Sequence, residues 1–102
     1  MEYVYIVHFD WTTDEESELE TYVYADYKDA VKKMKALIAN EMNPALSWVG
    51  DLAFNSAGKL NKGYHFYEFT DDSTGQDLFW RVANYENSSF YSFITLKKEK
   101  VL

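Results

Sequence analysis

Cysteine is absent from this chain, and its absence excludes disulfide bonds, a thiolate nucleophile and a thiolate metal site. Arginine is nearly absent, because Arg81 is the only one. The net charge of −7 repels the phosphate backbone that dominates affinity for nucleic acids, so direct binding to DNA or RNA is not expected. No stretch approaches the roughly 18 apolar residues of a membrane helix, and no membrane partner is expected either.

The chain also lacks the parts of a secretion signal and of the familiar catalytic motifs. Residues 1–11 carry no basic segment, and their apolar run is interrupted at His8 and Asp10, which favours a cytoplasmic location. There is no Gly-x-Ser-x-Gly elbow, no glycine-rich phosphate loop and no Cys/His metal spacing. The sequence therefore predicts a non-enzymatic protein with no catalytic residue, no cofactor and no metal ligand.

Aromatic residues are abundant, with nine Tyr, seven Phe and three Trp, and they mark strands. Strands are expected over residues 3–9, 19–25, 47–54, 64–70, 78–85 and 90–97, separated by turn-forming segments. For residues 47–54 a helical turn beginning at Ala45 remains an alternative at the start of the segment. The length of 102 residues suits one domain with a single core.

One helix is predicted between the second and third strands. Asp26 is a suitable N-cap, and apolar residues from Tyr27 to Met42 recur at the spacing of a single helical stripe. Pro44 cannot continue the helix interior, so the helix is expected to end near Asn43. The order ββαββββ predicts an α+β fold in which residues 1–102 form one domain, a mainly antiparallel sheet of five to six strands with one helix on one face.

A single helix about 10 Å wide covers roughly half of one face of a sheet about 25 Å across, so apolar sheet surface should remain for a partner. Alternation divides the strand residues into two sets. The set assigned to the helix side contains Val4, Ile6, Val23, Leu52, Phe54, Phe66, Trp80, Val82, Ile94 and Leu96. The tyrosine-rich set contains Tyr3, Tyr5, Tyr22, Tyr24, Tyr67, Phe69, Phe79, Arg81, Tyr91 and Phe93.

The tyrosine-rich set is the predicted protein-contact surface, for a second copy of the chain or for another protein. Tyrosine and arginine favour such contacts because they combine apolar area with a polar end. A purely structural use of these aromatics, as cross-strand pairs on a solvated sheet face, is the alternative interpretation.

Two other functions remain open at this stage. A small-ligand binder or enzyme would use a pocket between helix and sheet, lined by Trp48, Trp80 and either His8 or His65. An acidic inhibitor of a nucleic-acid-binding protein would present the carboxylates of residues 14–20 in place of phosphates. The acidic residues 71–77 lack the ligand spacing of a calcium loop and are interpreted as a hairpin turn.

Overall fold

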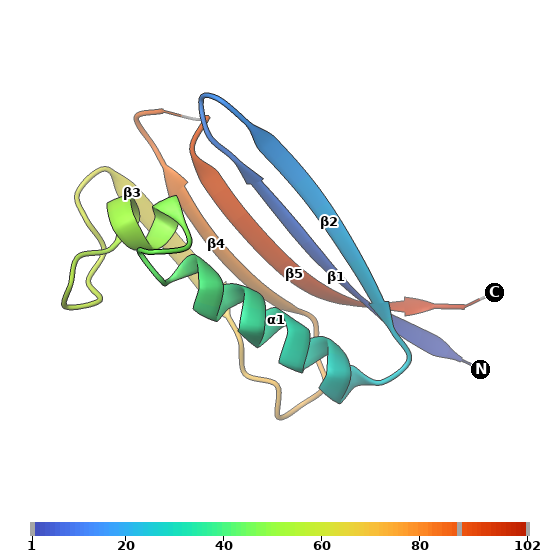
Figure 1. Ribbon diagram of the computed structural model, residues 1–102. Helices are drawn as coiled ribbons and strands as arrows, with labels where there is room; N and C mark the ends of the chain where they lie inside the picture. The colour runs from blue at the N-terminus through green and yellow to red at the C-terminus, as the bar shows by residue number, and fades with distance from the viewer. Residues whose placement is uncertain (1, 88, 102) are drawn as a thin grey trace.

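The computed structural model describes residues 2–87 and 89–101 and shows a five-stranded antiparallel sheet with one main helix on one face (Figure 1). The strand order across the sheet is β2-β1-β5-β4-β3. The elements are β1 (Tyr3–Thr12), β2 (Ser17–Tyr24), α1 (Tyr27–Glu41), η1 (Val49–Ala53), β3 (Tyr64–Phe69), β4 (Leu78–Asn84) and β5 (Tyr91–Lys100). The predicted α+β fold is confirmed.

Helix α1 begins and ends close to its predicted limits. Asp26 is the N-cap residue with an extended backbone, although its side chain makes no capping hydrogen bond. After Glu41 the chain leaves the helix, and the Met42 N–H donates to the Ile38 carbonyl at 2.9 Å. The predicted stripe faces the sheet, with Ala30, Val31, Met34 and Leu37 buried and Tyr27, Ile38 and Met42 packed at its margin.

The strand predicted over residues 47–54 is wrong. Val49–Ala53 forms one turn of π-helix, η1, and only Phe54 pairs as a strand would, through an isolated bridge to Leu60. The side chains that η1 buries completely are Val49 and Ala53, which lie four residues apart, as on a helix. Alternation suggested a strand because Trp48, Leu52 and Phe54 are also apolar, but the structure uses the helical spacing.

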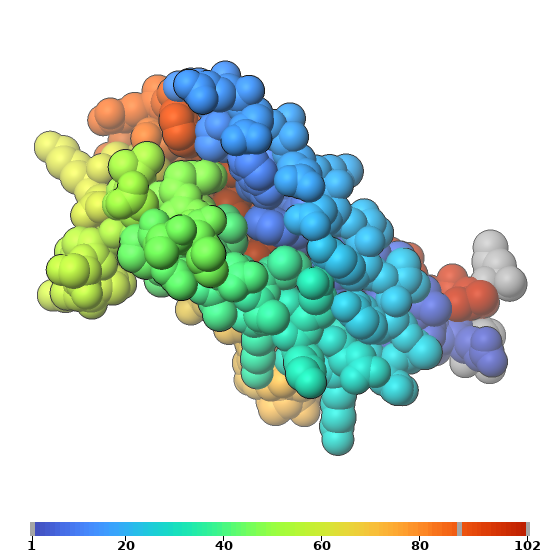
Figure 2. Space-filling view, viewed as in Figure 1, coloured from blue at the N-terminus to red at the C-terminus, as the bar shows by residue number. Residues whose placement is uncertain are grey.

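The core lies between the sheet and the two helical elements. Its sheet side consists of the central residues of β1, β5 and β4, and all of them are buried: Val7, Phe9, Ile94, Leu96, Leu78, Trp80 and Val82. Helix α1 packs on β1, β5 and β2, while η1 packs on β4. Figure 2 shows this side of the molecule, where the side chains of α1 and of the segment around η1 lie over part of the sheet and the N-terminal strands, in blue, stay in view beside them.

The opposite face of the sheet is covered by no element of the described residues (Figure 1). As predicted, the helical elements leave part of the sheet surface uncovered in this fold. We call this uncovered surface the open face.

Candidate contact surface on the open sheet face

The register of the strands fixes which side chains share the open face, because residues directly opposite each other in a sheet project to the same side. Two rows run across all five strands through the centre of this face. The first row is Leu19, Asp10, Phe93, Arg81 and Tyr67, and the second is Thr21, His8, Thr95, Phe79 and Phe69. Flanking rows contain Ser17, Thr12, Tyr91, Ala83 and His65 on one side, and Val23, Ile6 and Lys97 on the other.

Large apolar side chains stand exposed on this face. The exposed fractions are 66% for Leu19, 59% for Val23, 55% for Tyr67 and 40% for Phe79. Single exposed apolar residues are common on soluble proteins, but grouped ones are typical of an interaction surface. Phe79 and Tyr67 form one group with Phe69 on β4 and β3, while Leu19 and Val23 lie on β2 at the opposite edge.

Six of the ten residues predicted to form the contact surface lie on the open face: Tyr67, Phe69, Phe79, Arg81, Tyr91 and Phe93. The other four, Tyr3, Tyr5, Tyr22 and Tyr24, project to the side that carries α1. The prediction that all ten share one face is therefore wrong for β1 and β2. Val4, Ile6 and Val23, which the sequence assigned to the helix side, take their place on the open face.

On the helix side of β1, Val7 and Phe9 are buried in the core, while Tyr5, and Tyr22 opposite Val7 on β2, line the margin of α1. The Tyr5 ring meets the Tyr27 ring edge to face with centroids 5.4 Å apart, and the Lys33 Nζ lies 4.2 Å from the Tyr22 ring centroid. The Tyr22 hydroxyl donates to Glu20 Oε1 at 2.6 Å, and this bond, with burial and nearby carboxylates, raises the pKa of Tyr22 to about 12. A tyrosine there packs its ring and keeps its hydroxyl at the sheet edge, which an aliphatic side chain cannot do.

Phe93 stands at the centre of the open face with a charged residue on each side. The Arg81 guanidinium carbon lies 5.7 Å from the Phe93 ring centroid, and the Asp10 carboxylate accepts from the Tyr91 hydroxyl at 3.3 and 3.4 Å. Burial and the Asp10 carboxylate raise the pKa of Tyr91, so this hydroxyl keeps its proton. Within residues 2–87 and 89–101, neither Asp10 nor Arg81 forms an ion pair of 4 Å or less.

The two halves of the open face differ in relief. A shallow hollow of about 290 Å³ lies on the β1–β2 side, lined by His8, Asp10, Leu19, Phe93, Thr95 and Lys97. The β4–β3 side carries the exposed rings of Phe79 and Tyr67. One half therefore contains a hollow and an anion, and the other contains protruding rings and a cation.

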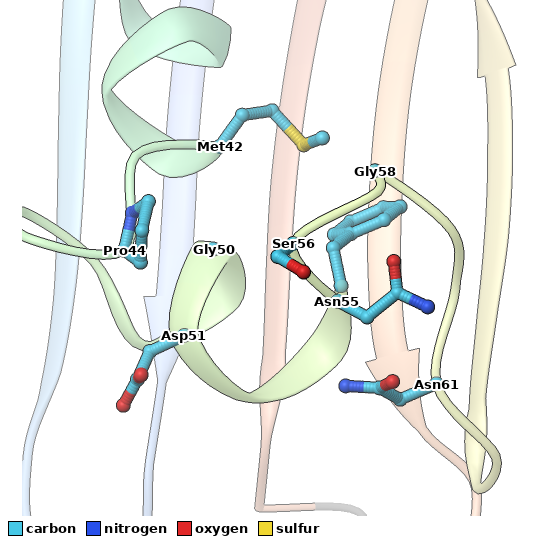
Figure 3. A pocket seen from close by; sticks show the side chains of 9 residues that line it. Met42, Pro44, Gly50, Asp51, Asn55, Ser56, Gly58 and Asn61 are labelled. Carbon is cyan, nitrogen blue, oxygen red and sulfur yellow. The ribbon is translucent and has the colours of Figure 1, made fainter.

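The pocket in Figure 3 lies at the end of α1, between η1 and the loop that follows it, and has a volume of about 560 Å³. Two of its polar side chains, Asn55 and Asn61, are used by the loop itself. The Asn61 side chain donates to the Leu52 carbonyl at 2.8 Å, and Asn55 Oδ1 accepts the backbone N–H groups of Ala57 and Lys59 at 2.9 and 3.0 Å. These bonds indicate a structural role for the pocket residues.

A second cavity, of about 370 Å³, lies between α1 and the β1–β2 turn, and its lining includes Trp11, Glu41 and Trp48. The Glu41 carboxylate is 8% exposed and accepts a hydrogen bond from the Ser92 hydroxyl at 2.8 Å. Burial raises the pKa of Glu41, and hydrogen bonds from Ser92 and Ser47 partly offset this increase. Sequence reasoning missed Glu41 although it lies on the buried stripe of α1, four residues after Leu37, because a carboxylate normally faces solvent.

The structure does not bring together the three side chains predicted to line a ligand pocket. Trp80 is 1% exposed and packs against Phe66, with ring centroids 5.9 Å apart. His8 and His65 both lie on the open face, where His8 Nδ1 is 3.1 Å from the Thr21 hydroxyl and His65 packs on the Tyr67 ring. Ligand binding or catalysis between helix and sheet stays a prediction.

The acidic segments form exposed turns. Asp14, Glu15, Glu16 and Glu18 are exposed in and next to the β1–β2 turn, where Asp14 accepts from the Asn87 side chain at 3.2 Å. Inhibition of a nucleic-acid-binding protein through these carboxylates stays a prediction. In the β3–β4 turn, Asp71 Oδ1 accepts the Ser73 N–H at 3.0 Å, and hydrogen bonds from Ser73 lower the pKa of Asp71. Across the described part of the chain, no three His, Asp or Glu residues are grouped as a metal site.

Comparison of the chain with protein-family models, curated proteins and solved structures finds no match. Its function must therefore be argued from its own surfaces. For residues 2–87 and 89–101, no helix has both the length and the apolarity to cross a membrane.

Proposed function

We propose that this protein works by protein contact rather than catalysis, and that its open face binds a second copy of the same chain. The observation that supports the proposal is the uncovered sheet face with its large exposed apolar side chains, including Leu19, Phe79 and Tyr67. Binding would remove these side chains from water, which is the main favourable contribution to most protein association.

The composition of the open face is that of a contact surface. Its central rows contain Phe93, Phe79, Tyr67 and Arg81, residue types that are enriched in interfaces, while lysine and glutamate are absent from those two rows. Lys97 lies in a flanking row, where solvent can reach it. The central rows therefore combine aromatic residues with one anion and one cation, Asp10 and Arg81, on either side of Phe93.

The size of the face is near the lower limit for a specific interface. Five strands spaced about 4.8 Å apart, with rows covering about 20 Å along them, give a flat footprint of roughly 500 Å² before side-chain relief is counted. Specific interfaces start at about 600 Å² of accessible surface per partner. The flat footprint lies just below this value, so the open face suits a weak or transient dimer.

A second copy fits this face because the face carries charges of both signs. Asp10 and Arg81 lie in the same row, on opposite sides of Phe93. A surface that contains both members of a charge pair can be complementary to itself, and symmetric dimers that use one patch twice are the commonest oligomers.

The proposal is tested by light scattering coupled to size exclusion over a series of concentrations. We expect the unmodified chain to form dimers, and we expect Phe79→Lys or Tyr67→Lys to shift it toward the monomer by at least about tenfold in dissociation constant, because each places a charge inside the interface. Leu46→Lys is the matched control, since Leu46 is 66% exposed but lies in the loop after α1. An unmodified chain that stays monomeric at every concentration would overturn the proposal.

A further inference from the structure

We infer that the two copies meet about a two-fold axis that runs along β5, so that Asp10 of each copy pairs with Arg81 of the other. This inference rests on the proposed function and specifies its geometry. It follows from three features of the open face: the position of β5, the placement of the charges and the difference in relief between the two halves.

β5 is the middle strand of the sheet, with β1 and β2 on one side and β4 and β3 on the other. When two such faces pack, a two-fold axis along β5 lays the β1–β2 half of one copy on the β4–β3 half of the second. Rows then face rows. Phe93 meets Phe93 of the second copy, Asp10 meets Arg81, and Leu19 meets Tyr67.

Two different two-fold axes would align the rows of one copy with the rows of the other, and the charges favour the axis along β5. A two-fold axis along the central row, perpendicular to the strands, would place Asp10 opposite Asp10 and Arg81 opposite Arg81. Like charges opposed in an interface cost several kcal/mol. The axis along β5 instead forms two symmetric Asp10–Arg81 pairs, and neither group has an ion-pair partner within the described residues of its own chain.

The relief agrees with the same axis. Phe79 lies in the row of His8 and Thr95, so the axis places the exposed Phe79 ring of one copy over His8 of the other. His8 lines the hollow of about 290 Å³ on the β1–β2 side. Each copy would thus insert its Phe79 ring into the hollow of the other, which gives two such contacts in the dimer.

Two further details are compatible with this arrangement. Face-packed sheets cross at about 30°, so the axis would bisect this angle and lie about 15° from the direction of β5. The crossing displaces side chains one strand from the axis by only about 2–3 Å, so the pairing of Asp10 with Arg81 is kept. Lys97 lies on β5 and would approach Lys97 of the second copy, but it is exposed in a flanking row, where repulsion between charges is weak.

Charge exchange tests the geometry. We expect Asp10→Arg and Arg81→Asp, each alone, to weaken the dimer by at least about tenfold, because each places like charges opposite one another. The double variant D10R/R81D should return the dissociation constant to within about threefold of the unmodified chain, since opposite charges then face again. The control D10R/K97D has the same net charge as D10R/R81D, but its introduced guanidinium still faces Arg81. Its dissociation constant should therefore stay as weak as that of Asp10→Arg alone.

A second measurement uses the absence of cysteine, which makes any introduced thiol unique. Thr95 lies on β5 beside the axis, whereas Thr21 lies two strands away on the same row. We expect Thr95→Cys to be joined to its own copy by a short bis-maleimide. Thr21→Cys should not be joined, because its two copies would stand about 19 Å apart across the sheet.

The outcomes separate the geometry from the proposed function. If the unmodified chain dimerises and Phe79→Lys weakens the dimer, but D10R/R81D stays weak and Thr95→Cys is not joined, the axis along β5 is wrong while contact through the open face stands. If the unmodified chain is a monomer at every concentration, the proposed function itself fails.

Discussion

At the scale of single residues, Glu41 is the most unusual group in the core. Its carboxylate is buried at the end of α1, against β5, and Ser92 donates to it at 2.8 Å. Burial disfavours the charged form, and the pKa of Glu41 is raised for that reason. An acid whose pKa is higher in the folded state binds its proton more tightly there, so the folded state loses stability as pH rises through that pKa.

We therefore expect Glu41→Gln to stabilise the fold near neutral pH, by on the order of 1 kcal/mol, because the amide oxygen keeps the bond from Ser92 without burying a charge. The difference should shrink as pH falls toward the ordinary carboxyl range, where Glu41 also becomes neutral. Urea unfolding followed at several pH values measures it. Glu68→Gln, at an exposed carboxylate on β3, is the control and should change stability by less than about 0.5 kcal/mol. A lower stability of Glu41→Gln at neutral pH would contradict the argument.

At the scale of elements, the sequence was informative where one periodicity had no competitor. Helix α1 was predicted within two residues of its bounds because Asp26 and Pro44 limit a single apolar stripe. The segment around η1 was predicted incorrectly because Trp48, Leu52 and Phe54 fit the alternation of a strand, while Val49 and Ala53 fit the spacing of a helix. Only tertiary packing of Val49 and Ala53 decides between the two.

The faces of β1 and β2 were assigned the wrong way round for a related reason. In the first half of β1, Tyr3 and Tyr5 alternate with Val4 and Ile6, so both sides are apolar there and do not fix the phase. The second half does fix it, because buried Val7 and Phe9 alternate with His8 and Asp10. Hydropathy assigned Ile6 and Val23 to the interior, but the margin of α1 requires rings such as Tyr5 and Tyr22. In β4 the phase was predicted correctly because Arg81 alternates with the strongly apolar Trp80 and Val82.

Gly50 is the element-scale residue whose replacement should be most damaging. A Cβ at Gly50 would lie 2.5 Å from the Met42 carbonyl oxygen and 2.7 Å from the Asn43 carbonyl carbon, both backbone atoms. The close approach of η1 to the end of α1 leaves no side chain that could move aside. We expect Gly50→Ala to destabilise the fold by about 1–3 kcal/mol, measured as a lower urea midpoint.

Ser56→Ala, in the exposed loop after η1, is the control for that substitution and should shift stability by less than about 0.5 kcal/mol. If Gly50→Ala were as stable as the control, the close packing of η1 on the end of α1 would not be required for the fold. The contact surface would then depend less on η1, which packs on β4 beneath Phe79 and Arg81.

At the scale of the whole molecule, the sequence predicted that a sheet face would stay uncovered but could not say which residues occupy it. Every helix and every sheet has nearly the same width per element, so the number of helices and strands is enough to predict an uncovered face. Naming the residues on that face needs the register of all five strands, which brings Leu19, Asp10, Phe93, Arg81 and Tyr67 into one row from separate segments of the chain. No local spacing contains that information.

Net charge gives the last prediction, because each copy carries −7 and two copies repel each other. At a centre separation equal to the smallest molecular extent, 22 Å, this repulsion is on the order of 9 kcal/mol in unscreened water. Salt screening reduces it to about 4 kcal/mol at 0.01 M ionic strength and about 1 kcal/mol at 0.1 M. The dimer should therefore tighten by up to about two orders of magnitude over this range.

Analytical ultracentrifugation of the unmodified chain at the two ionic strengths checks this expectation. The Asp10–Arg81 pairs oppose the trend only weakly, because short contacts removed from solvent are screened much less than the long-range repulsion. A chain that instead used its acidic β1–β2 turn to bind a basic partner would lose affinity with added salt, since attraction between opposite charges is screened in the same way. Self-association that weakens between 0.01 and 0.1 M ionic strength would therefore contradict contact through a largely apolar face between two anionic copies.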